Sequence, residues 1–130
     1  MFALDTNTLI YFFKNAGQVK DRFLATPPAE IAVPSIVLYE LELGIMQSSQ
    51  TIKRRAQLDT LLRSVRILMF DEAAAKISAQ AEATLRAAGT PIGPKDILIA
   101  GTVLATGATL VTHNIREFQR VRGLKIVDWY

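Results

Sequence analysis

The chain has 130 residues, half of them hydrophobic and 21% charged, a balance typical of a compact domain rather than a disordered chain. It has no cysteine and one histidine, which excludes disulfides, thiolate metal sites, a cysteine nucleophile and metal sites built from several imidazoles. The net charge of +3 is weak evidence for a nucleic-acid partner; the basic clusters at residues 53–55 and 116–125 add a little to it, although a solvated surface also explains them.

The first half of the chain alternates short apolar runs with longer segments of helical spacing. Residues 2–5 are apolar and end at an acid, which favours a buried strand with a functional group at its edge. The elements expected next, in chain order, are helices at about 8–14 and 18–25, a strand at 30–33, and helices at about 34–46 and 51–64.

The second half continues the alternation. An alanine-rich segment, residues 72–88, is strongly helix-forming; Asp71 is expected to cap it and Gly89 to end it. The other expected elements are a strand at 65–70, a helix at 96–106, a strand at 109–112, a short helix at 116–120 and a last strand at 125–127. Strands separated by helices predict an α/β fold, with a parallel sheet covered by helices on both faces.

We find no repeat, linker or low-complexity tract, and therefore expect a single domain over residues 1–130. The N-terminus lacks a basic leader and does not resemble a signal peptide. The longest mostly apolar stretch, residues 97–111, contains two glycines and is shorter than the ~20 residues that a membrane span needs. These features predict a soluble, cytoplasmic protein without a membrane partner.

Polar residues stand at the places where an open parallel sheet carries its site, which is beyond the carboxyl ends of the strands. Asp5 ends the first expected strand, and Thr112 to Asn114 follow the fourth. Asp96 opens the helix before that fourth strand. A further candidate, Glu40, interrupts a mostly apolar helix.

Each of these positions also has a purely structural interpretation. Asp5 can make a local turn hydrogen bond, and Glu40 can point to solvent. Asp96 lies in the first turn of a helix, where the helix dipole favours a carboxylate by about 0.3–1 kcal/mol. Asn114 can cap a helix and Glu117 can lie on its exposed face.

Taken together, the acids indicate chemistry. If the sheet brings Asp5, Glu40 and Asp96 together, two carboxylates ~4 Å apart repel by roughly 4 kcal/mol at an effective dielectric near 20, so the cluster needs either a cation or protonation of one acid. An all-oxygen site suits Mg²⁺ or Mn²⁺, which can activate water for attack on a phosphodiester. The sequence shows no competing serine–histidine arrangement and no phosphate-binding P-loop.

The polar motifs and the C-terminal segment resemble the PIN-domain ribonucleases and, more narrowly, the VapC toxins of bacterial type II (VapBC) toxin–antitoxin pairs. The motifs occur in the order and spacing of that family, and the similarity runs essentially from end to end. They are Leu4-Asp-Thr-Asn-Thr-Leu-Ile-Tyr-Phe12, Glu40-Leu-Glu-Leu-Gly44, Gly93-Pro-Lys-Asp-Ile-Leu-Ile-Ala100, Leu110-Val-Thr-His-Asn-Ile-Arg-Glu-Phe118 and Gly123-Leu-Lys-Ile-Val-Asp-Trp129.

The resemblance implies a three-layer α/β/α fold with a central parallel sheet of four to five strands and an acidic Mg²⁺ pocket in which Mn²⁺ can substitute. Asp5, Glu40 and Asp96 match three of the family's acids and would bind the metal. Many members have aspartate where this chain has Asn114, so either Asn114 or Glu117 fills the fourth position. The supporting polar residues would be Thr6, Asn7 and Thr112.

The resemblance also implies an activity and partners. The activity would be hydrolytic cleavage of RNA, with tRNA as the leading substrate, and inhibition of translation. The partners would be a second copy of the chain and a VapB-like antitoxin whose tail fills the groove, with operator DNA contacted only through the antitoxin.

Three other interpretations remain open. The first is a PIN module that has lost catalysis and binds RNA or a protein without cleavage. The second is a haloacid-dehalogenase-like phosphatase, although that family's second aspartate is Asn7 here. The third is a receiver-type signalling domain with Asp71 as phosphate acceptor, although Thr6 stands where its second acid belongs.

Overall fold

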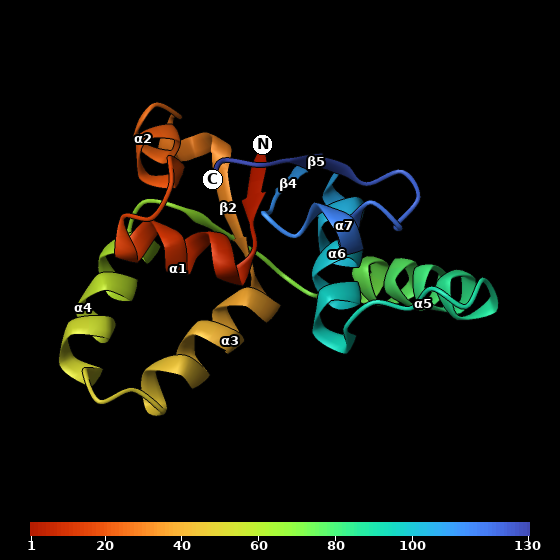
Figure 1. Ribbon diagram of the computed structural model, residues 1–130, viewed down its shortest axis with the longest axis horizontal. Helices are drawn as coiled ribbons and strands as arrows, with labels where there is room; N and C mark the ends of the chain where they lie inside the picture. The colour runs from red at the N-terminus through yellow and green to blue at the C-terminus, as the bar shows by residue number, and fades with distance from the viewer.

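Five short parallel strands form the centre of the protein in the computed structural model, which describes residues 1–130 (Figure 1). The strand order is β3-β2-β1-β4-β5, and all four strand pairs are parallel. The strands are β1 (Phe2–Leu4), β2 (Ile31–Pro34), β3 (Arg66–Leu68), β4 (Thr109–Val111) and β5 (Lys125–Val127).

Helices flank this sheet on both faces, as expected of a three-layer α/β/α fold (Figure 1). In Figure 1 the helices of the first half of the chain gather on one side of the molecule, and α5 and α6 pair on the other. The helices are α1 (Thr6–Lys14), α2 (Val19–Leu24), α3 (Ser35–Met46), α4 (Thr51–Leu62), α5 (Glu72–Ala87), α6 (Pro94–Thr106) and α7 (Ile115–Phe118), with a 3₁₀ turn, η1 (Pro28–Glu30). No helix has the length and hydrophobicity needed to cross a membrane.

The sheet lies in the hydrophobic core, as its sequence predicts. All four residues of β2 are buried, and so are Leu4, Leu110 and Val111 on the neighbouring strands. Parallel strands that are covered on both faces need such continuous apolar runs. The edge strand β5 is less buried, with Lys125 exposed at its start.

Several element ends differ from the expected ones, and prolines explain most of the differences. Glu30 belongs to η1 and not to a strand, because Pro28 favours the first position of a helical turn. Pro34 ends β2 with an extended ψ of 143°, so α3 begins one residue later than predicted. Helix α6 begins at Pro94, which places Asp96 inside its first turn and not at its start.

Two smaller differences concern α1 and α7. Helix α1 begins at Thr6 and not at residue 8, because Asp5 caps it. Helix α7 is shorter than predicted and ends at Phe118, so Arg120 lies beyond it and donates a hydrogen bond to the Pro91 carbonyl oxygen at 3.0 Å.

The strand order changes direction between β1 and β4. The chain runs from β1 outward to β2 and β3, then returns through α5 and α6 to place β4 on the other side of β1. Ligand sites of open α/β sheets lie at such a switch point, at the carboxyl ends of the strands. The pairing of Leu4 with Val111 puts the next residues, Asp5 and Thr112, side by side at this position.

The end of the chain is held against α1, where Tyr130 contacts the Tyr11 ring, and against the segment that follows α1. The backbone N–H of Gln18 donates to the Tyr130 carbonyl oxygen at 2.8 Å, and the Tyr130 ring stacks on His113 with 4.4 Å between centroids. His113 is also bonded to Asp128, 2.8 Å from Nδ1 to Oδ2. The lone histidine therefore has partners in the C-terminal segment and none among the candidate acids.

Candidate functional site

Asp5 is the most buried of the candidate acids, with 5% of its surface exposed. Its Oδ1 caps α1 by accepting a hydrogen bond from the Thr8 backbone N–H at 2.9 Å, and the Thr112 side chain bonds to the same carboxyl group. Burial raises the pKa of Asp5 above its usual value, and the hydrogen bonds from Thr112 and Thr8 oppose this rise. The local turn bond expected for an aspartate at a strand end is therefore present, and the carboxylate is also rigidly placed at the switch point.

Glu40 reaches the same region from α3. Its Oε1 accepts a 2.7 Å hydrogen bond from the Thr6 hydroxyl, which connects the first turn of α1 to a residue 34 positions later. Glu40 is only partly buried and does not simply point to solvent. Thr6, predicted as a supporting residue, thus orients Glu40.

Asp96 and Glu117 complete the acidic group. The pKa of Asp96 is raised to about 6, first because the carboxyl group is partly buried and then because Glu117, Glu40 and Asp5 repel its negative charge. The Asp96 carboxylate lies close to Gly93, because a Cβ added to Gly93 would be 3.0 Å from Asp96 Oδ2. Any other residue at position 93 would therefore crowd this carboxylate. The four acids are therefore electrostatic neighbours.

The two candidates for the fourth acidic position, Asn114 and Glu117, lie next to each other at the site. The Asn114 amide Nδ2 lies 3.3 Å from Glu117 Oε2, and the Asn114 backbone N–H donates to the Thr112 hydroxyl at 3.0 Å. Glu117 also contacts the carboxyl group of Asp96. Asn114 therefore positions Glu117, which carries the charge. Asn7, the remaining predicted residue, is exposed and makes no side-chain hydrogen bond.

None of the four site acids has a basic partner. The ion pairs of the structure involve six other acids, namely Glu30, Glu42, Asp59, Glu72, Glu82 and Asp128. Partial burial first, and then repulsion among neighbouring carboxylates that are unfavourable when all are ionised, raises the pKa of Asp96. The site thus lacks the positive charge that its acids require.

A hydrated divalent cation fits this donor set. All the available ligands are oxygens, the kind that Mg²⁺ and Mn²⁺ prefer. The structure holds no group of three or more histidine, aspartate or glutamate side chains placed to hold a metal by themselves. The acids do not form the closed cage that three meeting carboxylates would give, but Mg²⁺ usually keeps several waters and needs only one or two carboxylates.

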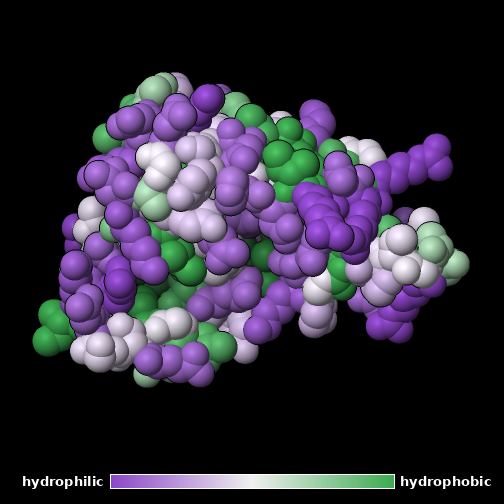
Figure 2. Space-filling model, in the orientation of Figure 1, coloured by the Kyte–Doolittle hydropathy of each residue, from purple (hydrophilic) through white to green (hydrophobic).

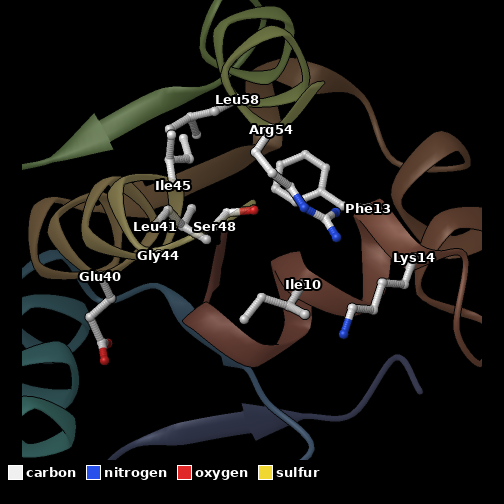
Figure 3. Close-up of a pocket in the computed structure, with 10 residues that line it drawn as sticks. All are labelled: Ile10, Phe13, Lys14, Glu40, Leu41, Gly44, Ile45, Ser48, Arg54 and Leu58. Atoms are coloured by element: carbon white, nitrogen blue, oxygen red, sulfur yellow. The ribbon is translucent and has the colours of Figure 1, made fainter. Parts of the chain in front are cut away.

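A groove of about 220 Å³ leads away from Glu40 between α1, α3 and α4 (Figure 3). Its floor is apolar, and Figure 2 shows hydrophobic residues in a hollow with hydrophilic residues around it. In Figure 3, Lys14 of α1 and Arg54 of α4 extend beside the apolar floor, while the Glu40 carboxylate points away from it toward α6. One residue of the first basic cluster therefore lines this groove, whereas its neighbour Arg55 is paired with Glu42.

Sequence reasoning missed the surroundings of the acids. Lys14 does not stand out in the sequence, and the basic cluster that contains Arg54 could not be assigned to a groove shared with Glu40, because that groove depends on the packing of three helices. Tyr39 and Lys95 were missed although each directly precedes a candidate acid, and adjacency was the signal that could have found them. Asp71, the phosphate acceptor of a receiver-type site, instead caps α5 beyond β3, two strands away from β1.

The raised pKa of Asp96 predicts how the metal-free protein responds to pH. Because the pKa is about 6 in the folded protein against 3.8 normally, the folded state holds this proton more tightly. The contribution of the Asp96 proton to the free energy of unfolding is complete below pH ~4 and is lost as the pH rises through 6. The raised pKa of Asp5 acts with the same sign.

We therefore expect the melting temperature of Asp96→Asn to exceed that of the parent at pH 8 in the presence of EDTA. The expected difference is about 3 °C, because the partial exposure of Asp96 weakens the repulsion. The difference should shrink toward pH 4.5. Differential scanning fluorimetry across this range tests it, and a parent that gains stability over Asp96→Asn as the pH rises would contradict the assigned repulsion.

Comparison with known proteins gives a consistent result. Residues 2–124 match the family model described as "PIN domain". The chain is 36% identical to a Salmonella typhimurium protein named tRNA(fMet)-specific endonuclease VapC, over 98% of this chain and 97% of the relative.

Solved structures agree with the sequence comparison. The DNA-bound VapBC of Salmonella typhimurium superposes with a TM-score of 0.92 at 36% identity, covering 99% of this chain and 98% of that one. VapBC2 of Rickettsia felis, bound to a DNA fragment from its promoter, gives a TM-score of 0.92 at 31% identity with the same coverage.

Proposed function

The chain belongs to the PIN-domain family, in its VapC branch, and from this premise we propose that it is a Mg²⁺-dependent endoribonuclease, the toxin of a toxin–antitoxin pair. The reaction is hydrolysis of an RNA phosphodiester, and its consequence in the cell is inhibition of translation. The observation that carries the proposal is the group of four acids without a basic partner at the switch point of the sheet.

Each residue has a defined part in this mechanism. Asp5 and Asp96 would hold the Mg²⁺ ion, and Mn²⁺ is expected to substitute for it. Asp5 is suited to this part because Thr8 and Thr112 fix its carboxylate, so little side-chain freedom is lost on binding. A divalent ion held there would supply activation of a water molecule and positive charge to offset that of the phosphodiester under attack.

Glu40 would either bind the metal ion directly or orient the attacking water. Thr6 occupies its Oε1, and no protein group donates to its Oε2, which is therefore free to accept a proton from that water. Asn114 donates a hydrogen bond to Glu117 at the edge of the site, where Glu117 would complete the set of oxygen ligands. Thr112 supports both sides of the site, since it bonds to Asp5 and to the Asn114 backbone.

We propose tRNA as the leading substrate. The support is the name of the Salmonella typhimurium relative, a tRNA(fMet)-specific endonuclease. Lys14 and Arg54, which line the groove beside Glu40, provide positive charge for RNA phosphates without selecting a sequence.

The proposed partners are a VapB-like antitoxin and a second copy of the chain. The groove between α1, α3 and α4 has an apolar floor, which suits apolar residues of an antitoxin tail, and the Glu40 carboxylate beyond one end of the groove suits a basic residue of that tail. The solved VapBC complexes contain DNA, and we propose that this chain meets operator DNA only through its antitoxin.

The experiment that tests the function is cleavage of total tRNA by purified protein shown to be free of antitoxin. We expect discrete fragments with Mg²⁺ or Mn²⁺ and none with EDTA. Fragments that persist in EDTA would contradict metal dependence. Folded protein that binds RNA without cutting it, over a panel of tRNA, ribosomal RNA and messenger RNA, would favour the catalytically degenerate PIN module.

A further inference from the structure

An exposed tyrosine and an exposed lysine meet at the edge of the acidic site. Tyr39 directly precedes Glu40 on α3, and Lys95 directly precedes Asp96 on α6. The Lys95 ammonium lies 5.6 Å from the centre of the Tyr39 ring, so the pair connects the two helices that carry these acids.

Structural stability does not explain this pair. Tyr39 is 54% exposed, and its hydroxyl makes no hydrogen bond within the protein. Lys95 is exposed and forms neither an ion pair nor a hydrogen bond, although Asp96 follows it directly in the sequence. An exposed cation–π contact contributes little to folding, and α3 and α6 already pack against each other.

The pair offers the two kinds of contact that a single RNA strand uses. An ammonium group pairs with a backbone phosphate, and an aromatic ring stacks on an unpaired base. A basic side chain is needed beside the acidic site in particular, because its four acids repel the RNA phosphates that must approach them. Lys95 is adjacent to one of these acids and has no protein anion to neutralise it.

We propose that Tyr39 and Lys95 form a substrate clamp, in which Lys95 holds a phosphate beside the scissile one and Tyr39 stacks on the base of that nucleotide. The clamp rests on the proposed ribonuclease function and adds to it the two residues that would position the substrate. A base inside a duplex has no free face for Tyr39, so loops and single strands are selected. Both residues are positioning residues, and neither takes part in the bond cleavage.

The substrate clamp is tested by measuring RNA binding and RNA cleavage separately. In an Asp5→Asn background, fluorescence anisotropy with a labelled single-stranded RNA and with an RNA duplex gives binding without cleavage. We expect Tyr39→Ala and Lys95→Ala each to weaken single-strand binding about 10-fold, with Tyr39→Phe within about twofold of the parent. Lys95→Ala should also reduce the salt dependence of binding, whereas Tyr39→Ala should leave duplex binding unchanged.

In the otherwise unchanged protein, the same two variants should raise KM much more than they lower kcat. Lys76→Ala, on the exposed surface of α5, is the matched control and should leave both constants as they are. If the parent cleaves RNA, and Tyr39→Ala and Lys95→Ala bind and cleave RNA as well as the parent does, the proposed clamp is wrong but the proposed ribonuclease function stands. If the folded parent neither binds nor cleaves RNA, both are overturned.

Discussion

RNA cleavage is expected to fall by roughly 10²–10³-fold when either Asp5 or Asp96 is replaced by asparagine, with the fold retained. Each substitution removes one negative charge and changes the side-chain volume little. Asparagine caps helices about as well as aspartate, so Asp5→Asn keeps the bond to the Thr8 N–H that begins α1. Asp96→Asn removes a charge that the neighbouring acids repel, so it is not expected to unfold the protein.

The matched control is Asp71→Asn. Asp71 caps α5 through its Oδ1 and the Ala74 N–H at 2.9 Å, the same distance as in the cap made by Asp5, but it lies outside the acidic site. Cleavage by Asp71→Asn should match that of the parent. The measurement is single-turnover cleavage of a tRNA substrate, with circular dichroism to verify the fold. Normal cleavage by Asp5→Asn or Asp96→Asn would show that the proposed metal site is wrong.

Much of the fold follows from local sequence signals. The apolar run of β2 and the alanine-rich α5 with its cap at Asp71 were predicted because short-range preferences and burial act in the same direction there. The predicted parallel sheet covered by helices is confirmed, with five strands. Errors occurred where a proline belongs to the end of one element rather than the start of the next, as at Pro34.

The candidate site was predictable in part. Asp5 and Thr112 could be placed at one edge because they end strands, and the switch point makes those strands neighbours. Contacts made by side chains from distant elements could not be predicted, because they depend on how helices pack. The bond from Thr6 to Glu40 and the approach of Lys95 to Tyr39 are of this kind.

The packing of α5 against α6 leads to the largest stability effect that we expect. Gly101 of α6 faces Ser78 of α5, and a Cβ on Gly101 would lie 1.8 Å from Ser78 Oγ, 2.8 Å from its Cβ and 3.0 Å from its Cα. Rotating the serine hydroxyl removes only the first clash, so Gly101→Ala must push the two helices apart. Overpacking of this kind costs about 1–3 kcal/mol, more than the 0.5–1 kcal/mol that alanine adds by its helix propensity.

We therefore expect Gly101→Ala to lower the melting temperature by roughly 5–10 °C. Gly44→Ala is the matched control, since Gly44 is also inside a helix but no atom lies within 4 Å of its added Cβ. That variant should be as stable as the parent or slightly more stable, because only the helix propensity changes. Introducing Ser78→Gly into Gly101→Ala should cost less than Ser78→Gly does in the parent, because it removes the clashing side chain. Equal melting temperatures for Gly101→Ala and Gly44→Ala would contradict the close approach of α5 and α6, since only that contact makes the two glycines different.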